Sequence, residues 1–257
     1  MKCPKPLKVN RLFIWKARLG LIKSILFDIK GKGKLKLLQN KKLSDDEEYI
    51  LSYKSIKFIL TSRHGLGLLS IPYYEPRVYD IILQSRGNVF IDIGSFEGGY
   101  VLFTYKNFKE IVAVEPFPDN LKILEKNIRL NNINNVKIVN KAVSSKRGRV
   151  KLYLADNPYN SSIVFNSNRY VEVETITLDE LLSPYNSIDL VKIDVEGAEL
   201  DVIKSGISQL HKVKKIVIEV RNQYENEIDS ILIKEGFKKC ILEDRGHEKN
   251  ILYYVGE

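Results

Sequence analysis

The stretch Val89-Phe90-Ile91-Asp92-Ile93-Gly94-Ser95-Phe96-Glu97-Gly98-Gly99 decides the fold of this chain, together with Ile111-Val112-Ala113-Val114-Glu115-Pro116. The first segment is a short apolar run that enters a turn containing glycines. The second is another apolar run, and it ends at Glu115, which comes 23 residues after Asp92. In an open parallel sheet the carboxyl ends of neighbouring strands share one edge, where nucleoside ligands bind and an acid accepts the ribose hydroxyls. The two segments therefore predict a nucleoside site on a parallel α/β sheet.

The spacing of the glycines narrows the class of ligand. In Asp92-x-Gly94-x-x-x-Gly98 the glycines are further apart than in the GxGxxG turn of dinucleotide enzymes, and an acid precedes them. A dinucleotide site needs an unobstructed cradle for its pyrophosphate, so this loop favours a cofactor with an amino-acid tail and no phosphate. S-adenosylmethionine is the first interpretation, and a nicotinamide oxidoreductase is the last.

From residue 88 onward, strand patterns alternate with helical patterns. Such alternation predicts a parallel sheet with right-handed crossovers. Thr177 and Glu180 form a capping-box pattern before one of the helices. Two final strands with no helix between them put one antiparallel strand into the sheet, which argues against a dinucleotide domain. The expected strands are 88–93, 110–115, 135–139, 188–193, 215–220, 237–243 and 250–255, with an inserted pair at 148–155 and 170–176, and the expected helices are 99–107, 118–131, 178–182, 198–205 and 224–234.

The positive charge of the chain is concentrated at its N-terminus. Residues 1–42 contain 13 Lys or Arg and one acid, a net charge of +12, whereas the remaining residues carry 28 basic and 31 acidic side chains, a net charge of −3. Three interpretations of this segment stay open: contact with anionic lipid, contact with nucleic acid, or a solvated basic surface. Apolar residues at helical spacing predict an amphipathic helix over residues 11–29, which either lies on a membrane or docks on its own domain: Leu12, Trp15, Leu19, Ile22, Leu26 and Ile29.

The segment between this helix and the sheet shows weaker patterns. Residues 56–60 are predicted to form a short strand. Residues 71–76 contain two prolines and are predicted to form a rigid loop, followed by a short helix at 77–84.

Composition bounds the class of protein. The 257 residues are 44% hydrophobic and 28% charged, which is typical of a globular chain with one α/β domain. Cys3 and Cys240 lie near opposite ends of the chain, so we expect neither a zinc-ligand pair nor a disulfide framework. Two such cysteines fit a protein of a reducing compartment. Because there is no run of 18 apolar residues and no signal-peptide core, we expect a cytoplasmic location, with membrane association through residues 11–30 as an option.

Seven motifs follow one another between residues 70 and 255. With them the chain resembles the FkbM family of S-adenosylmethionine-dependent methyltransferases. One departure stands out: the family commonly has Gly-Ala-Asn-x-Gly in its first loop, whereas this chain has Gly94-Ser95-Phe96-Glu97-Gly98. The motifs are Tyr74-Glu75-Pro76, Asp92-Ile93-Gly94, Val114-Glu115-Pro116-Phe117-Pro118-Asp119-Asn120, Asn140-Lys141-Ala142-Val143-Ser144, Ser161-Ser162-Ile163, Thr177-Leu178-Asp179-Glu180-Leu181 and Val191-Lys192-Ile193-Asp194-Val195-Glu196-Gly197-Ala198-Glu199.

The resemblance implies a Rossmann-like class I methyltransferase fold over residues 70–257, with a mostly parallel seven-stranded sheet and one antiparallel strand. Residues 1–69 then form a basic N-terminal extension that holds the amphipathic helix and the short strand. The family methylates hydroxyl oxygens, so the expected acceptor is a glycan, a glycolipid or a small metabolite.

Two alternatives remain. One is an RNA methyltransferase that uses the basic arm on phosphates, although Asp194-Val195-Glu196-Gly197 is not the Asn/Asp-Pro-Pro-aromatic motif of base-directed enzymes. The other is a cofactor-binding module without activity, because Phe96 stands where the family has asparagine.

The resemblance and the strand ends together predict the site. Asp92 is expected to hold the methionine ammonium, directly or through water, and Glu115 to accept the ribose hydroxyls. Asp194 and Glu196 are the predicted catalytic residues, because a hydroxyl acceptor needs a base as the C–O bond forms. Substrate contacts are expected from Ser161, Glu219 and Arg221, and no metal site is predicted. The full set of expected cofactor-binding residues is Glu75, Asp92, Gly94, Ser95, Phe96, Gly98, Glu115, Pro116, Asn140, Ala142 and Val143.

Overall fold

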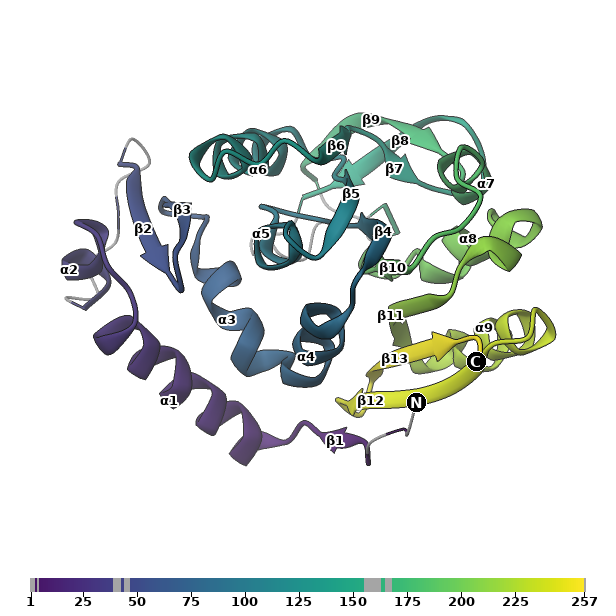
Figure 1. Ribbon diagram of the computed structural model, residues 1–257, viewed down its shortest axis with the longest axis horizontal. Coiled ribbons are helices and arrows are strands. Elements are labelled where there is room, and N and C mark those ends of the chain that lie inside the picture. The colour runs from purple at the N-terminus through teal and green to yellow at the C-terminus, as the bar shows by residue number, and fades with distance from the viewer. Residues whose placement is uncertain are drawn as a thin grey trace.

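The computed structural model describes residues 3, 5–38, 43, 47–154, 163–164 and 168–256. Its main sheet has eight strands in the order β1-β12-β13-β11-β10-β4-β5-β6 (Figure 1). Neighbours pair in parallel except at β13, which is antiparallel to both β11 and β12. The predicted mostly parallel sheet with one antiparallel strand is confirmed. The strand bounds are β1 (Leu7–Lys8), β4 (Gly87–Ile93), β5 (Phe108–Val114), β6 (Val136–Val139), β10 (Leu190–Ile193), β11 (Lys215–Arg221), β12 (Lys238–Asp244) and β13 (Glu248–Tyr254).

The sheet has one strand more than the seven expected. The additional strand, β1, comes from the N-terminal extension and pairs in parallel with β12, with Leu7 opposite Glu243. A two-residue strand is too short to show an alternating pattern, so its sequence carries no signal of it. By pairing with β12, β1 binds the N-terminal segment to the edge of the sheet.

Helices cover both faces of the sheet, because successive strand side chains point to opposite sides. On β4, Phe90 points into one core with α4 (Pro76–Gln84), α5 (Gly99–Thr104) and α6 (Pro118–Leu130). Ile91 points into the other core with α7 (Leu178–Leu182), α8 (Glu199–Lys204) and α9 (Asn222–Lys234). The capping box of α7 is confirmed: Thr177 Oγ1 accepts from the Glu180 N–H at 3.2 Å, and Glu180 Oε2 accepts from the Thr177 N–H at 3.1 Å.

The residues before the sheet form α1 (Arg11–Phe27), α2 (Gly33–Leu38), the hairpin β2 (Tyr49–Tyr53) and β3 (Ile56–Leu60), and α3 (Leu66–Tyr74). Phe58 and Leu60 of the hairpin are fully buried in the same core as Phe90. The predicted strand at 56–60 is confirmed. Its partner β2 was not predicted, because the turn residues Lys54 and Ser55 are not the Asn-Gly type that indicates a hairpin in a sequence. In the structure both turn residues have left-handed φ values, 48° and 70°.

The predicted rigid loop at 71–76 is wrong. Residues 66–74 form α3 with Pro72 inside it, and Pro76 begins α4. Leu68 and Leu69 of α3 are almost completely buried, and the helix packs against α1 and α5. This tertiary packing outweighs the loss of one helical hydrogen bond at Pro72.

A small second sheet carries the predicted insertion. β8 (Gly148–Tyr153) and β9 (Tyr170–Ile176) form the expected antiparallel pair, and β7 (Ala142–Val143) joins β9 as a third strand. Because β7 follows β6 closely along the chain, this sheet lies beside the carboxyl edge of the main sheet.

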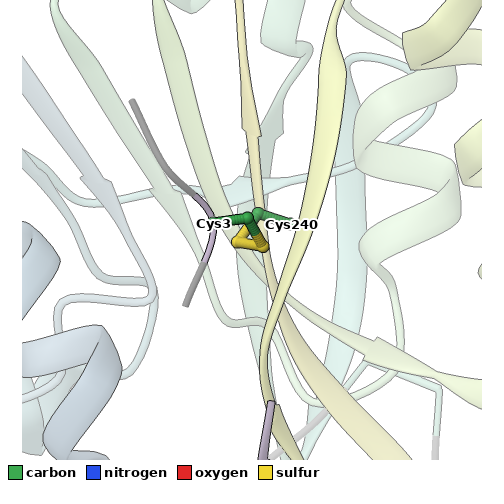
Figure 2. The surroundings of a disulfide bond; sticks show 2 residues. All are labelled: Cys3 and Cys240. Atoms are coloured by element: carbon green, nitrogen blue, oxygen red, sulfur yellow. A yellow bond between two sulfur atoms is a disulfide. The ribbon is translucent and has the colours of Figure 1, made fainter. Parts of the chain in front are cut away.

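The expectation for the cysteines is also wrong, because Cys3 and Cys240 form a disulfide bond across 237 residues of sequence (Figure 2). The parallel register of β1 and β12 explains the pairing. Leu7 lies opposite Glu243; Cys3 comes four residues before Leu7, and Cys240 three residues before Glu243, so the chain that leads into β1 runs beside β12. The linear sequence contains no sign of this register.

Among the described helices, none is both long enough and apolar enough to cross a membrane.

Candidate active site

A cavity of about 900 Å³ lies at the carboxyl ends of β4, β5, β10 and β11. Most of the predicted site residues line it. Asp92 and Gly98 are buried and do not line it, Asn140 is exposed and does not line it, and Ser161 falls outside the described residues. The predicted residues that line the cavity are Glu75, Gly94, Ser95, Phe96, Glu115, Pro116, Ala142, Val143, Asp194, Glu196, Glu219 and Arg221.

The loop after β4 is held tightly against the neighbouring strands. The N–H groups of Gly94 and Ser95 both donate to the Val114 carbonyl at 3.0 Å. Gly94 has a φ of +80°, and a Cβ at this position would lie 1.8 Å from the Asp194 carbonyl oxygen. No other residue fits there, so glycine at this position lets the β4 and β10 loops meet. Phe96, which follows, adopts a left-handed φ of 52° on the cavity wall.

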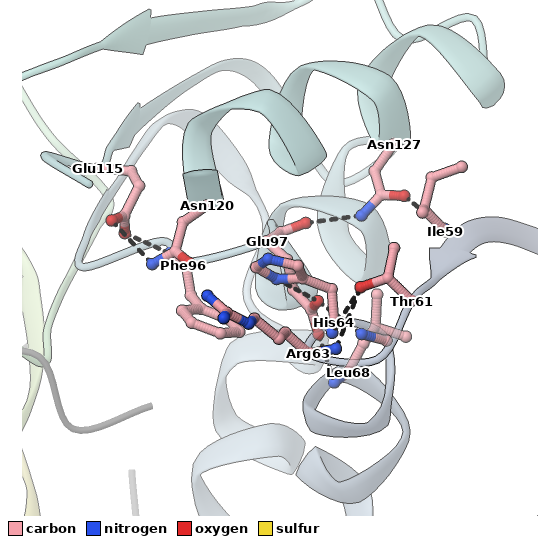
Figure 3. Close-up of polar contacts among 11 residues, drawn as sticks. Ile59, Thr61, Arg63, His64, Leu68, Phe96, Glu97, Glu115, Asn120 and Asn127 are labelled. Carbon is pink, nitrogen blue, oxygen red and sulfur yellow. Dashed lines mark hydrogen bonds and ion pairs between the residues drawn. The ribbon is translucent and has the colours of Figure 1, made fainter. Parts of the chain in front are cut away.

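Glu115 is the buried acid at the end of β5. The residue is 4% exposed, and its two oxygens accept hydrogen bonds from the Phe96 N–H at 2.8 Å and Asn120 Nδ2 at 3.1 Å (Figure 3). They also accept one from the Phe117 N–H at 2.9 Å. Burial raises the pKa of Glu115 to about 7, and these hydrogen bonds oppose the shift. The donors fix the carboxylate on the cavity wall, where it can accept further hydrogen bonds from a ligand.

Glu97 lies in the first loop, where the sequence differs from the usual family motif, and its side chain caps the N-terminus of α3. Its carboxylate accepts from the Gly65 N–H at 2.7 Å and the Leu68 N–H at 3.1 Å (Figure 3). His64 Nδ1 lies 3.6 Å from the same carboxylate, and both side chains are buried. A carboxylate at the N-terminus of a helix satisfies N–H groups that have no partner within the helix. The unusual loop therefore joins α3 to the cavity wall.

Lys192 is a site residue that the sequence analysis missed. It lies opposite Asp92 in the register of β10 with β4, and it is 5% exposed. Its Nζ donates to Asp194 Oδ2 at 3.1 Å and lies 4.0 Å from Asp92 Oδ1. The one available signal was a lysine inside the otherwise apolar strand Leu190–Ile193.

Asp92 depends on this lysine. It is 1% exposed, and neither of its oxygens accepts a hydrogen bond from the described residues. Burial raises the pKa of Asp92 to about 6, whereas the Lys192 ammonium lowers it. The two carboxylates on either side in turn raise the pKa of Lys192 against its burial. Lys192 thus keeps a buried acid ionised directly behind the cavity.

Three carboxylates meet at the other end of the cavity. One oxygen each of Asp194, Glu196 and Glu219 lies within 4.8 Å of the others. Burial, and then the charge of Asp194, raise the pKa of Glu196 to about 8 and the pKa of Glu219 well above its usual value. Such a cluster can share protons between its members or hold a divalent cation. No metal site was predicted from the sequence, because Glu219 lies on the neighbouring strand β11. Its distance from Asp194 and Glu196 depends on how the strands pair, which the sequence does not show.

Further polar residues surround this acidic cluster. Tyr100 Oη donates to Glu75 Oε2 at 2.9 Å, and burial, followed by Asp194, raises the pKa of Glu75. Arg245 of the β12–β13 turn also lines the cavity. Neither Tyr100 nor Arg245 was predicted, because each comes from a segment without a recognisable motif.

The loop after β10 has its own internal support. Glu199 Oε1 accepts from the Gly197 N–H at 2.9 Å and the Val195 N–H at 3.3 Å. Glu196, between them, has a left-handed φ of 56°. A Cβ at Gly197 would lie 2.8 Å from the Arg221 guanidinium, so glycine makes room for that side chain. Strained backbone of this kind is concentrated at functional sites, where the surrounding structure holds it in place.

Comparisons with known proteins find similarity to methyltransferases. The chain is 28% identical over 205 residues to the methyltransferase sdnD of Sordaria araneosa; the aligned region covers 64% of this chain and 79% of that protein. It is 24% identical over 146 residues to a putative methyltransferase of Jannaschia sp., covering 50% of this chain and 52% of that one. Among solved structures, a methyltransferase FkbM from Methylobacillus flagellatus superposes with a TM-score of 0.49 at 17% identity; the match covers 74% of this chain and 53% of that one.

The family model of the methyltransferase FkbM domain matches residues 90–239, from β4 to β12. This range contains the loops after β4 and β10, which line the cavity, and the strands that lead to Glu115 and Asp194 or carry Glu219. The chain therefore belongs to the FkbM family of methyltransferases.

Proposed function

We propose that this methyltransferase uses S-adenosylmethionine and methylates a hydroxyl oxygen of a glycan, a glycolipid or a small metabolite. The observation that carries the proposal is one cavity with a ribose-type acid, Glu115, at one end and the acidic cluster of Asp194, Glu196 and Glu219 at the other. The first feature suits a nucleoside cofactor, and the second suits an acceptor that must lose a proton.

The residues of the first end fit the cofactor. Glu115 presents buried carboxylate oxygens that can accept from both ribose hydroxyls. The oxygens of Asp92, which accept no hydrogen bond from the described residues, lie behind the Gly94 loop, where a water molecule can connect them to an ammonium group in the cavity. Ala142 and Val143 of β7 supply an apolar wall for adenine. When bound, S-adenosylmethionine supplies a methyl group on a positively charged sulfur that leaves as a neutral thioether.

The residues of the second end fit a hydroxyl acceptor. We assign Asp194 as the base that takes the hydroxyl proton, because its side chain is 28% exposed and Lys192 orients it through Oδ2. Glu196, with a pKa of about 8, carries a proton in most molecules at neutral pH. A protonated carboxyl group both donates and accepts hydrogen bonds, which matches the mixed character of neighbouring hydroxyl groups on a sugar-like acceptor.

Calorimetric titration with S-adenosylhomocysteine tests the cofactor. The wild type should bind with a saturable isotherm, Glu115→Ala and the shape-conserving Glu115→Gln should lose binding at least tenfold, and the exposed control Glu227→Ala should bind as the wild type does. A folded wild type that does not bind would overturn the proposal.

A rate assay on hydroxylated acceptors tests the base. Asp194→Asn should bind S-adenosylhomocysteine normally and lose most of its transfer rate. Equal rates for Asp194→Asn and the wild type would remove Asp194 as the base while leaving the cofactor assignment intact.

A further inference from the structure

Helix α1 has two apolar faces, and only one of them packs on the protein. Ala17 and Ser24 are buried, and Leu21 and Ile25 pack against the main core. On the same face, a Cβ at Gly20 would lie 2.5 Å from the ring of Tyr73, so this glycine lets α1 approach α3 closely. This face accounts for the docking of α1 on its own domain.

The opposite face of α1 is exposed to solvent. Successive residues of an α-helix are about 100° apart, so the five apolar residues of this face fall within about 80° of arc and form one continuous stripe. Six of the fourteen large apolar side chains that are exposed in the described part of the chain lie on α1. A concentration of this kind marks an interaction surface. The apolar stripe consists of Leu12 (59% exposed), Trp15 (58%), Leu19 (44%), Ile22 (51%) and Leu26 (42%).

Basic side chains border the apolar stripe on both sides. Arg11 and Arg18 flank one edge, Lys16 and Lys23 flank the other, and all four are exposed. The helix contains no acidic residue. Long basic side chains beside an apolar stripe can reach up to phosphate groups while the stripe enters the acyl boundary of a bilayer. From this arrangement we propose that α1 is a docking site for an anionic membrane surface, with the apolar stripe inserted and the four basic residues on lipid headgroups.

The helix is held firmly in the orientation that docking needs. At its N-terminal end, β1 pairs with β12, and the Cys3–Cys240 disulfide reinforces that edge. At its C-terminal end, Lys30 and Ser52 exchange two backbone hydrogen bonds of 3.0 and 2.9 Å. Figure 1 shows α1 along the outside of the molecule, with α3 on its inner side. The protein therefore presents the apolar stripe without having to fold a free arm.

The charge pattern favours a lipid surface over the other occupants. A nucleic acid would use the basic residues but would leave the five central apolar side chains in contact with a charged backbone. A second copy of this chain would bring the same four cations against each other. An anionic bilayer satisfies both the apolar centre and the basic borders.

Trp15 is the only tryptophan of the chain, so its fluorescence reports this helix alone. The full-length protein is titrated with vesicles of phosphatidylcholine containing about one third phosphatidylglycerol, with pure phosphatidylcholine vesicles in parallel. We expect a blue shift of the emission and co-sedimentation with the anionic vesicles, both weakened by raising the salt concentration. Leu19→Ser/Ile22→Ser should reduce the partition at least tenfold, whereas the control Ile207→Ser/Ile233→Ser, two equally exposed residues elsewhere, should bind as the wild type does.

Circular dichroism and a thermal melt establish that each variant is folded. An unchanged Trp15 emission at saturating anionic vesicle would overturn the proposal, as would equal binding of Leu19→Ser/Ile22→Ser and the wild type. A blue shift that appears without vesicles and rises with protein concentration would assign the stripe to self-association instead, and so would also overturn it. These readouts require no methyl transfer and are independent of the proposed function.

Discussion

In the variant Lys192→Met, the free energy of unfolding should fall as pH rises above neutrality. In the wild type it should stay nearly constant over the same range, because Asp92 there has a pKa of about 6 and is already mostly ionised. Lys192 is the one cation within 4.0 Å of the buried Asp92 among the described residues, and methionine removes the charge while keeping most of the volume. Without that charge, burial and the charge of Asp194 both raise the pKa of Asp92 further above the present value of about 6.

The size of the effect follows from the distance. Two unit charges 4.0 Å apart interact by about 4 kcal/mol at an effective dielectric constant of about 20. This energy corresponds to about 3 pKa units, so the pKa of Asp92 should rise to about 9 in the variant. A carboxyl group with a raised pKa in the folded state lowers the free energy of unfolding progressively as pH rises from its pKa in the unfolded chain to its pKa in the folded state. Between pH 6.5 and 8.5 the variant should therefore lose about 2.5 kcal/mol relative to the wild type.

Urea denaturation followed by circular dichroism at several pH values measures this difference. The wild type, Lys192→Met and the exposed control Lys122→Met are compared, each with and without Asp92→Asn. The Asp92→Asn background is needed because Lys192 also pairs with Asp194 and lowers the pKa of Glu75, and it shows how much of the difference depends on Asp92. The gap between Lys192→Met and the wild type should widen with pH, and the control should run parallel to the wild type. A constant gap from pH 6.5 to 8.5 would refute the assignment of Lys192 as the residue that keeps Asp92 ionised.

Two further predictions concern other buried groups. The pKa of Glu196 is raised to about 8, so its favourable contribution to the free energy of unfolding is present near pH 5 and lost as pH rises through 8. The variant Glu196→Gln does not titrate, so it should melt at a higher temperature than the wild type at pH 9 and at nearly the same temperature at pH 5.5. Equal shifts at both pH values, or an equal gain in the exposed control Asp80→Asn, would contradict this. Asn127 donates to the Glu97 carbonyl at 2.9 Å and accepts from the Ile59 N–H at 2.8 Å, so Asn127→Ala should lower the free energy of unfolding by about 2–4 kcal/mol in urea titrations. A loss below about 1 kcal/mol would show that these two bonds do not join the hairpin to the site loop.

The elements that sequence reasoning located best are those whose signals are local. The strand ends at Ile93 and Val114 and the capping box of α7 follow from residues within a few positions of one another. The Pro72 helix and the β2 strand were missed, because a proline and an unusual turn argued locally against what tertiary packing favours.

The same distinction applies to the site. The positions of Asp92, Glu115 and Asp194 at one edge of the sheet could be predicted, because each lies at the end of an apolar strand and parallel strands end at the same edge. The role of Glu97 as the cap of α3 could not, since its partners lie 29 and 32 residues earlier. Nor could the position of Lys192, because the register between β4 and β10 sets its distance from Asp92.

The amino-acid sequence by itself determined the alternation of strands and helices from residue 88 onward, the acids at the strand ends and the apolar stripe of α1, because each depends on which side chains repeat along a short stretch of backbone. Only the tertiary structure decided that Cys3 meets Cys240, that three carboxylates converge, and that the stripe of α1 beginning at Leu12 faces solvent while the opposite face packs on the protein. The physical reason is that a periodic pattern states which face of an element is apolar, whereas the partner of that face is chosen by contacts between residues far apart in the chain.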